Sequence, residues 1–162
     1  DGLLSDDVLF YYPSRAYHYS GWHRAEGYTK TMKKHGLEPI IVASTYAPSS
    51  ENIERLGNEL KCHRPTAIIV CGFLMQTLIF ETCRQIAFRI PEDLSILSCD
   101  VDPRQVSTFT TSIGGISYDR YEVGKMGGEM MLDIKSSPHH SFESKAVTGD
   151  FISGDCLSSP SS

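Results

Sequence analysis

Short, continuous runs of apolar residues recur at helix-length intervals along this chain of 162 residues. The four clearest runs lie within Asp7–Tyr12, Pro39–Ser44, Thr66–Val70 and Leu94–Leu97. A strand that is apolar on both of its faces is buried on both, which is typical of a parallel sheet with helices packed on either side. The runs therefore predict an α/β fold, built on an open, mainly parallel sheet with helices on both faces.

The segments around these runs carry the signals of helix ends. Gly36 stands where a helix can end in a left-handed residue, and Asp119 with Glu122 fits a capping box in which Asp replaces Ser or Thr. Two further strands are predicted, near Ile113–Ser117 and at Ala146–Ile152. The predicted helices are Trp22–His35, a segment from the turn at Pro48–Ser50 to about Lys61, Leu74–Phe88 and Arg120–Ile134.

Charge and hydropathy narrow the classes of partner. The chain has 15 Lys and Arg residues against 20 Asp and Glu residues, a net charge of −5, whereas a nucleic-acid-binding module usually carries a basic face. No apolar run approaches the roughly 20 residues that span a bilayer, and the segment Asp1–Asp7 is acidic where a signal peptide is basic. We expect a cytoplasmic protein that contacts neither nucleic acid nor membrane through this chain.

The spacing of cysteine and histidine residues predicts neither a metal site nor a cofactor. The five cysteines form no CxxC pair and the six histidines are scattered, whereas zinc ligands recur at short spacings. Cys71 and Cys99 lie within or beside apolar runs, which favours buried, reduced thiols. The GxSxG, P-loop, HExxH and GxGxxG motifs are missing, and Gly114–Gly115 more simply allows close backbone approach, so we do not expect an enzyme.

A ligand of an open parallel sheet binds beyond the carboxyl ends of the strands. The segments that follow the predicted strands contain Arg24 and Asp100, whose opposite charges suit directed hydrogen bonds. The spacing alone also allows Arg24 to be a surface residue of its helix and Asp100 to cap a turn. Aromatic residues that could stack on a sugar or purine ring lie in the same segments. They are Tyr17, Tyr19, Trp22, Tyr46 and Phe73.

Two stretches resemble the LacI/GalR family of bacterial transcription regulators. They are HRPTAIIVC at His63–Cys71 and IPEDLSILSCD at Ile90–Asp100. In addition, RAEGY at Arg24–Tyr28 resembles the family's R-x-x-G-[FYW] pattern, and Ile116–Gly124 resembles its strand-to-helix return. The resemblance covers the chain from Asp7 to about Pro160.

The resemblance implies a function and a domain organisation. We expect the effector-binding and dimerisation portion of a regulator that senses a small molecule and controls DNA binding through a helix-turn-helix domain absent from this chain. Residues 1–112 would form the second lobe of the effector core, residues 113–137 a return strand and helix of the first lobe, and residues 138–162 the segment that rejoins the second lobe. The alternative is a lobe of a periplasmic sugar-binding protein of a transporter, which shares the fold.

The resemblance also implies which residues form the pocket. The expected effector-binding residues are Arg24, Asp100, Tyr46 and Ser20. The expected pocket-lining residues are Trp22, Gly72, Phe73 and Tyr118. Gly72 and Phe73 replace polar residues of the family pattern, and a pocket that lacks polar partners binds hydroxyl groups less selectively. Either the effector is less polar than a free sugar, or Phe73 stacks on a ring, or the pocket is degenerate.

Two apolar surfaces are expected to be covered. The candidates for a dimer interface are Thr77, Phe80 and Phe109, although Phe80 could instead join Leu78 and Ile79 in the core. The helix Arg120–Ile134 is expected to pack against its own lobe or a neighbouring copy, because its apolar residues would otherwise be exposed. Those residues are Val123, Met126, Met130 and Met131.

Overall fold

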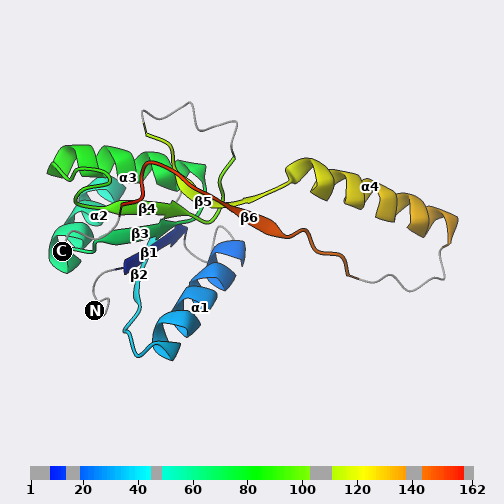
Figure 1. Cartoon of the computed structure of the whole chain (residues 1–162), viewed down its shortest axis with the longest axis horizontal. Helices are drawn as coiled ribbons and strands as arrows, with labels where there is room; N and C mark the ends of the chain where they lie inside the picture. Colours follow the sequence, from blue (N-terminus) through cyan, green and yellow to red (C-terminus); the bar gives the residue numbers. More distant parts are fainter. Residues whose placement is uncertain (1–7, 14–18, 45–48, 103–110, 138–143, 159–162) are drawn as a thin grey trace.

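The computed structural model describes residues 8–13, 19–44, 49–102, 111–137 and 144–158, which build one six-stranded sheet and its helices (Figure 1). The strands are β1 (Val8–Pro13), β2 (Ile40–Ser44), β3 (Ala67–Val70), β4 (Ser95–Ser98), β5 (Gly114–Tyr118) and β6 (Gly149–Ile152). The helices are α1 (Tyr19–Lys34), α2 (Ser50–His63), α3 (Phe73–Ile86) and α4 (Arg120–Ser136). The sheet order is β2-β1-β3-β4-β5-β6, with all neighbours parallel except β5 and β6. The predicted fold class is confirmed.

Alternate side chains of the central strands supply two hydrophobic cores, one on each face of the sheet. Leu9 and Tyr11 of β1 are buried in the larger core, which packs α2 and α3 against the sheet. Phe10, which lies between them, is buried in the smaller core with Ala25 and Tyr28 of α1. This alternation follows from the two-residue period of a strand. The helices therefore cover both faces, as the continuous apolar runs predict (Figure 1).

Local capping sets the helix ends. Asp119 caps α4, because its carboxylate accepts hydrogen bonds from the backbone N–H groups of Tyr121 and Glu122. Gly36 follows α1 with φ at +73°, the left-handed conformation that its position predicts. The largest differences from the predicted bounds are three residues, at the start of α1 and at the start of β6.

Close backbone approach explains the paired glycines of β5. A Cβ atom on Gly115 would collide with the backbone of Ser98 on the neighbouring strand β4. A Cβ atom on Gly114 would lie 2.6 Å from Leu157 Cδ1, and a Cβ atom on Gly154 would collide with the backbone N of Gly114. The prediction that these glycines serve a tight backbone approach, and not a phosphate loop, agrees with this packing.

Helix α4 projects away from the sheet (Figure 1). None of its residues is buried, and Met131 and Leu132 are 66% and 68% exposed. The expectation that this helix packs against its own lobe is wrong for the described residues. The reason is that β5 leads the chain away from both hydrophobic cores (Figure 1). Met126 and Met130 there line an open hollow together with Tyr118, Lys145 and Val147. No helix in the described ranges has the length and apolar character needed to cross a membrane.

Candidate functional site

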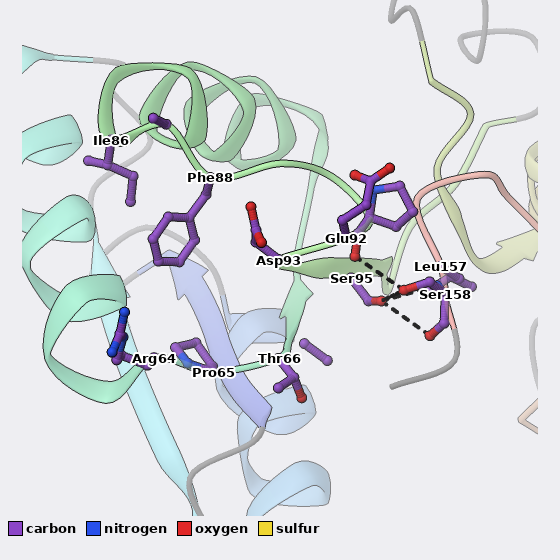
Figure 2. Close-up of a pocket in the computed structure, with 13 residues that line it drawn as sticks. Arg64, Pro65, Thr66, Ile86, Phe88, Glu92, Asp93, Ser95, Leu157 and Ser158 are labelled. Carbon is purple, nitrogen blue, oxygen red and sulfur yellow. Dashed lines mark hydrogen bonds between the residues drawn. The ribbon is translucent and has the colours of Figure 1, made fainter. Parts of the chain in front are cut away.

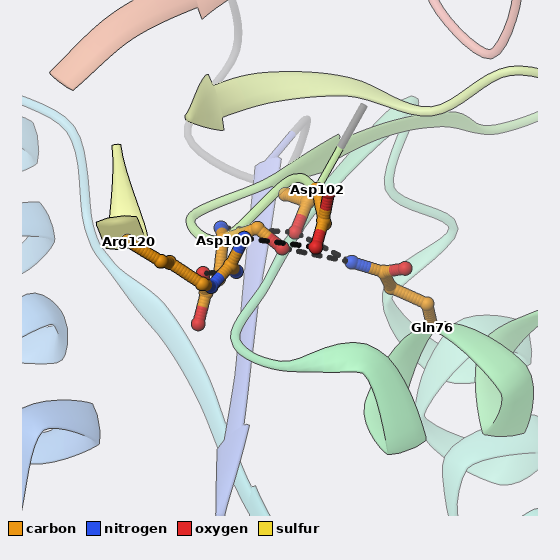
Figure 3. A network of polar contacts seen from close by, with 5 residues as sticks. Gln76, Asp100, Asp102 and Arg120 are labelled. Atoms are coloured by element: carbon orange, nitrogen blue, oxygen red, sulfur yellow. Dashed lines mark hydrogen bonds and ion pairs between the residues drawn. The ribbon is translucent and has the colours of Figure 1, made fainter. Parts of the chain in front are cut away.

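A network of polar side chains occupies the carboxyl end of β4 (Figure 3). Asp100 lies two residues beyond the end of that strand. Its Oδ1 atom is 2.6 Å from Nη2 of Arg120, and Oδ2 of Asp102 is 3.4 Å from Nη1 of the same guanidinium group. One arginine therefore bridges two carboxylates of the segment that follows β4.

Buried amide and hydroxyl groups hold this segment in place. Gln76 on α3 donates from Nε2 to Ser98 Oγ at 2.7 Å and to the Asp100 carbonyl at 3.4 Å. Ser98 Oγ also accepts from the Asp100 backbone N–H at 3.1 Å. Gln76 is 5% exposed and Ser98 is fully buried, and hydrogen bonds are stronger in such a low-dielectric environment. The exit of β4 is thereby tied to α3.

Arg120 reaches the network because it is the first residue of α4. Its guanidinium carbon lies 5.1 Å from the ring centroid of Tyr118, at the end of β5, which is a cation–π contact. The side chain of Arg120 is 36% exposed, against 23% for Asp100 and 11% for Asp102. Solvent therefore screens the ion pairs only in part, and the arginine can still exchange partners.

A hollow of about 380 Å³ opens beside the ion pairs. Tyr118, Asp119 and Arg120 line it from β5 and the start of α4, and Asp150 lines it from β6. It offers an aromatic ring, a guanidinium group and carboxylates within one concave surface. That combination suits a small molecule that carries a ring and hydroxyl groups.

A pair of thiols lies at the same strand ends, on the face that α1 covers. Cys71 directly follows β3 and Cys99 directly follows β4. The hydrogen bond that the Cys71 thiol donates lowers the pKa of Cys99, and the positive charge of Arg24 adds to this. The same hydrogen bond, together with burial, raises the pKa of Cys71. Of the two thiols, Cys99 therefore ionises first.

A larger hollow, of about 690 Å³, lies at the opposite, amino-terminal ends of β3 and β4 (Figure 2). Ser158 closes one side, because its N–H donates to Ser95 Oγ at 3.1 Å and its Oγ donates to the Pro91 carbonyl at 3.2 Å. None of the described effector-binding candidates lines either hollow, but Tyr118, an expected pocket-lining residue, lines the smaller one, as do Asp102 and Arg120 of the ion-pair network. Parallel sheets bind ligands at the carboxyl ends of their strands, so the smaller hollow is the better candidate.

The structure brings the two charged candidates of the sequence to the same strand ends. Arg24 and Asp100 both lie close enough to Cys99 to act on its charge. Asp100 is paired with Arg120 and does not merely cap a turn. Gly72 is the N-cap of α3, with φ at +90°, and brings no side chain to the site.

The aromatic and small polar candidates are more scattered. Ser20 and Trp22 lie in the first turn of α1 and are half-buried, and the Trp22 ring is 5.0 Å from the ring of His23. Tyr46 lies outside the described residues. Phe73 is the first residue of α3, and its side chain also lies outside the described part of the structure.

The dimer-interface candidates divide between surface and core. Thr77 is exposed on α3, whereas Leu78 and Ile79 are fully buried. Phe80 is half-buried and packs against the larger core. Phe109 lies outside the described residues. The dimer itself stays a prediction.

Sequence reasoning missed Arg120, Gln76 and Asp102. Asp102 carries a usable signal, because residues two apart in an extended segment point to the same side, and Asp100 was already a candidate. Arg120 carries no comparable signal, since an arginine in the first turn of a helix is ordinary. Only the meeting of β4, β5 and α4 shows its role.

The sequence predicts buried thiols and no metal site. Within the described ranges, no group of three or more His, Cys, Asp or Glu side chains is placed to hold a metal ion. Cys71, Cys83 and Cys156 are buried, as predicted, and Cys99 is half-buried. Cys62 is exposed, so the prediction of buried thiols is wrong there, because Cys62 lies off the face of α2 that buries Leu56 and Leu60.

Comparison with known sequences identifies related regulators. A family model described as a periplasmic binding protein-like domain matches residues 6–152. The HTH-type transcriptional repressor PurR of Edwardsiella ictaluri is 25% identical over 117 residues, which is 70% of this chain and 34% of the repressor. The chain thus spans about a third of the length of the curated relatives that it matches.

Comparison with solved structures gives the same architecture. A LacI family transcriptional regulator from Bifidobacterium animalis has a TM-score of 0.82 at 19% identity, over 96% of this chain and 56% of that chain. A LacI family regulator from Enterococcus faecium, solved with bound ribose, has a TM-score of 0.77 at 16% identity, over 92% of this chain and 55% of that chain. At these identities the likeness concerns the fold.

Proposed function

Since this chain belongs to the family of periplasmic binding protein-like domains, matched over residues 6–152, we propose that it is the effector-binding part of a transcription regulator of the LacI type. The observation that carries the proposal is the bridge from Arg120 to Asp100 and Asp102 beside the hollow at the carboxyl ends of the strands. The similarity to a repressor and to regulators of this type supports it.

The effector is a small molecule with hydroxyl groups on a ring. Its hydroxyl groups donate to the carboxylates of Asp100 and Asp102 and accept from the guanidinium group of Arg24 or Arg120. Such hydrogen bonds to charged groups are shorter and stronger than neutral ones. The ring of Tyr118, already in contact with Arg120, supplies an apolar face for the ring of the effector.

Binding at Asp100 couples to the position of α4. Arg120 is the first residue of that helix, and its ion pairs with Asp100 and Asp102 hold the helix base to the segment that follows β4. An effector hydroxyl that takes over Asp100 weakens this hold. A ligand shifts a conformational equilibrium only through such a difference in contacts between the two states.

The remaining features of the regulator belong to the same proposal. Residues 1–112 form one lobe, residues 113–137 lead into a second lobe, and residues 138–162 return. A dimer that uses Thr77, Phe80 and Phe109, a cytoplasmic location and DNA binding through another domain of the protein complete it. The alternative, a sugar-binding lobe of a transporter, gains no support from the relatives named above.

A thermal-shift screen of the intact protein tests the proposal, with ribose and other free sugars, nucleosides and small carboxylic acids as probes. A ligand at about 100 times its Kd should stabilise the folded state by about 2.7 kcal/mol. The shift should disappear in Arg24→Ala and in Asp100→Asn. Arg84→Ala, which removes an exposed arginine of α3, should retain it.

The same screen also gives the contradicting outcomes. A shift that survives both Arg24→Ala and Asp100→Asn would place the ligand elsewhere. If no class of probe shifts the wild-type protein, the hollow is not an effector site. A gel-shift assay with the ligand found then asks whether it changes the affinity of the intact protein for DNA.

A further inference from the structure

The strand order of the sheet places two cysteines side by side. In the parallel pair β3–β4, Val70 lies opposite Ser98, so the next residues on each chain are Cys71 and Cys99. The Cys99 N–H still bonds to the Val70 carbonyl at 2.8 Å, which keeps the two chains together at this point. Adjacent strands run about 4.8 Å apart, within the roughly 4.4–6.8 Å between Cα atoms that a disulfide spans.

Both side chains point to the same face of the sheet. Ile68 and Val70 belong to the core that α2 and α3 cover, so the alternation of the strand sends Cys71 to the face of α1. Cys71 is 2% exposed in that smaller core, and the half-buried Cys99 packs against it. The two thiols lie close enough for each to shift the pKa of the other. One thiol of the pair is therefore buried and the other is accessible.

The interaction between the two thiols divides their roles, because it lowers the pKa of Cys99 and raises that of Cys71. The guanidinium group of Arg24 favours the thiolate form at both sulfur atoms. A thiolate, and not a thiol, is the nucleophile in cysteine oxidation. The accessible Cys99 is thus the attacking residue, and the buried Cys71 is placed to resolve the product.

We propose that Cys71 and Cys99 form a modification site in which a hydroperoxide converts the adjacent thiols into a disulfide. The Cys99 thiolate attacks one peroxide oxygen, the O–O bond breaks, and a sulfenic acid forms while the other oxygen leaves as hydroxide or alkoxide and takes up a proton. The Cys71 sulfur then attacks the sulfenic sulfur. The S–S bond forms, the S–O bond breaks, and the hydroxide leaves with the Cys71 proton as water. Two thiols lose two electrons, and the peroxide gains them.

The modification goes beyond the proposed function and does not depend on it, because both thiols and Arg24 belong to this chain. It does lie beside the effector site, since Asp100 directly follows Cys99. The other cysteines serve as internal controls. Cys83 and Cys156 are buried in the larger core, where burial raises the pKa of Cys83 to about 12 and that of Cys156 to about 11. Cys62 is exposed on α2.

The test is a disulfide map of the full chain after treatment with equimolar hydrogen peroxide. The reduced protein is oxidised, its remaining thiols are alkylated, and a tryptic digest is analysed by mass spectrometry. A Cys62→Ala, Cys83→Ala background removes ambiguity, because both residues share the tryptic peptide Cys62–Arg84 with Cys71. We expect this peptide to be linked to Ile90–Arg104, which contains Cys99, with the loss of two hydrogen atoms.

Two further measurements separate the roles of the residues. Cys71→Ala should abolish the link and leave Cys99 as a sulfenic acid that dimedone traps, whereas Cys156→Ala should keep the link.

The rate of Cys99 alkylation should rise with pH and reach half its maximum below pH 9.0, which is the ordinary pKa of a thiol. The wild-type map shows whether the two peptides are linked, and the Cys62→Ala, Cys83→Ala background then assigns the link to Cys71, so misfolding of that variant would not hide the link itself. A link between other cysteines, sulfinic acid at Cys99 without a link, or no reaction at equimolar peroxide would each overturn the proposal.

Discussion

Gln76 shows how a single buried residue supports the site without facing the hollow. Its amide holds both the Ser98 hydroxyl and the Asp100 carbonyl, and so fixes the segment that carries the two carboxylates. Asp100 and Asp102 then share one guanidinium group. The chemistry at the end of β4 therefore depends on a side chain from α3 that is almost fully buried.

Gln76→Leu should destabilise the fold by about 1–3 kcal/mol. The reason is that it leaves the Ser98 hydroxyl and the Asp100 carbonyl without the hydrogen bonds that the Gln76 amide donates. The measurement is urea denaturation followed by circular dichroism. Gln85→Leu on the same helix is the matched control: Gln85 is exposed and bonds only to Glu81 among the contacts described, so its loss should change stability by less than about 0.5 kcal/mol. Equal losses in the two variants would contradict the role given to Gln76.

Among the elements, β5 links the sheet to α4 and depends on its glycines. Its first residues pass so close to β4 and to the segment after β6 that side chains have no room. The strand then ends at Tyr118, and the cap at Asp119 starts α4 at once, which delivers Arg120 to Asp100. The position of the arginine is therefore set by a short run of backbone contacts.

Gly115→Ala should cost about 1–3 kcal/mol or more, because the new methyl group collides with the backbone of Ser98 and neither strand can yield freely. Gly27→Ala is the contrasting variant. Gly27 is an exposed residue inside α1 with nothing within 4 Å of a Cβ, so alanine should stabilise the helix by about 0.5–1 kcal/mol. Thermal denaturation of both variants shows whether each substitution raises or lowers the stability of the fold. A neutral Gly115→Ala would mean that β5 lies further from β4.

At the scale of the whole molecule, the chain divides into a packed sheet and a projecting helix (Figure 1). The sheet and α1, α2 and α3 contain both hydrophobic cores, whereas α4 has no buried residue. A helix without packed neighbours is marginally stable in water, since most helical stability in proteins comes from tertiary packing. The exposed apolar side chains of α4 form a surface that a partner could cover.

Hydrogen exchange of this chain should therefore show much weaker protection in α4 than in α3. Helix α3 is packed in the core through the fully buried Leu78 and Ile79. Its backbone hydrogen bonds should therefore open, and its amides exchange, only near global unfolding. Mass spectrometry of pepsin fragments gives both helices in one experiment. Sedimentation of the same sample is the control. Protection of α4 equal to that of α3 in a monomer would contradict the projecting geometry, and equal protection in a dimer would support packing against a neighbouring copy.

The positions of the helices and strands and the class of fold follow from local features of the sequence. Continuous apolar runs predict strands that are buried on both faces. The capping residues Gly36 and Asp119 act on the backbone of the helix beside them. The observed bounds agree with these signals to within a few residues. The place of the site, at the carboxyl ends of parallel strands, also follows from the class of fold. Arg24 and Asp100 could be named for this reason.

Which side chains meet at the site depends on how the strands and helices pack together. Arg120 pairs with Asp100 across twenty residues of sequence, and Cys71 meets Cys99 because β3 and β4 are neighbours in register. The sequence likewise did not predict that α4 projects from the sheet, since its apolar residues are typical of a packed helix. Strand order, register and the direction of a helix depend on the balance of all contacts at once. The local propensity of a segment does not depend on those distant contacts. Candidate site residues can therefore be named from the sequence more easily than the side chains that contact them.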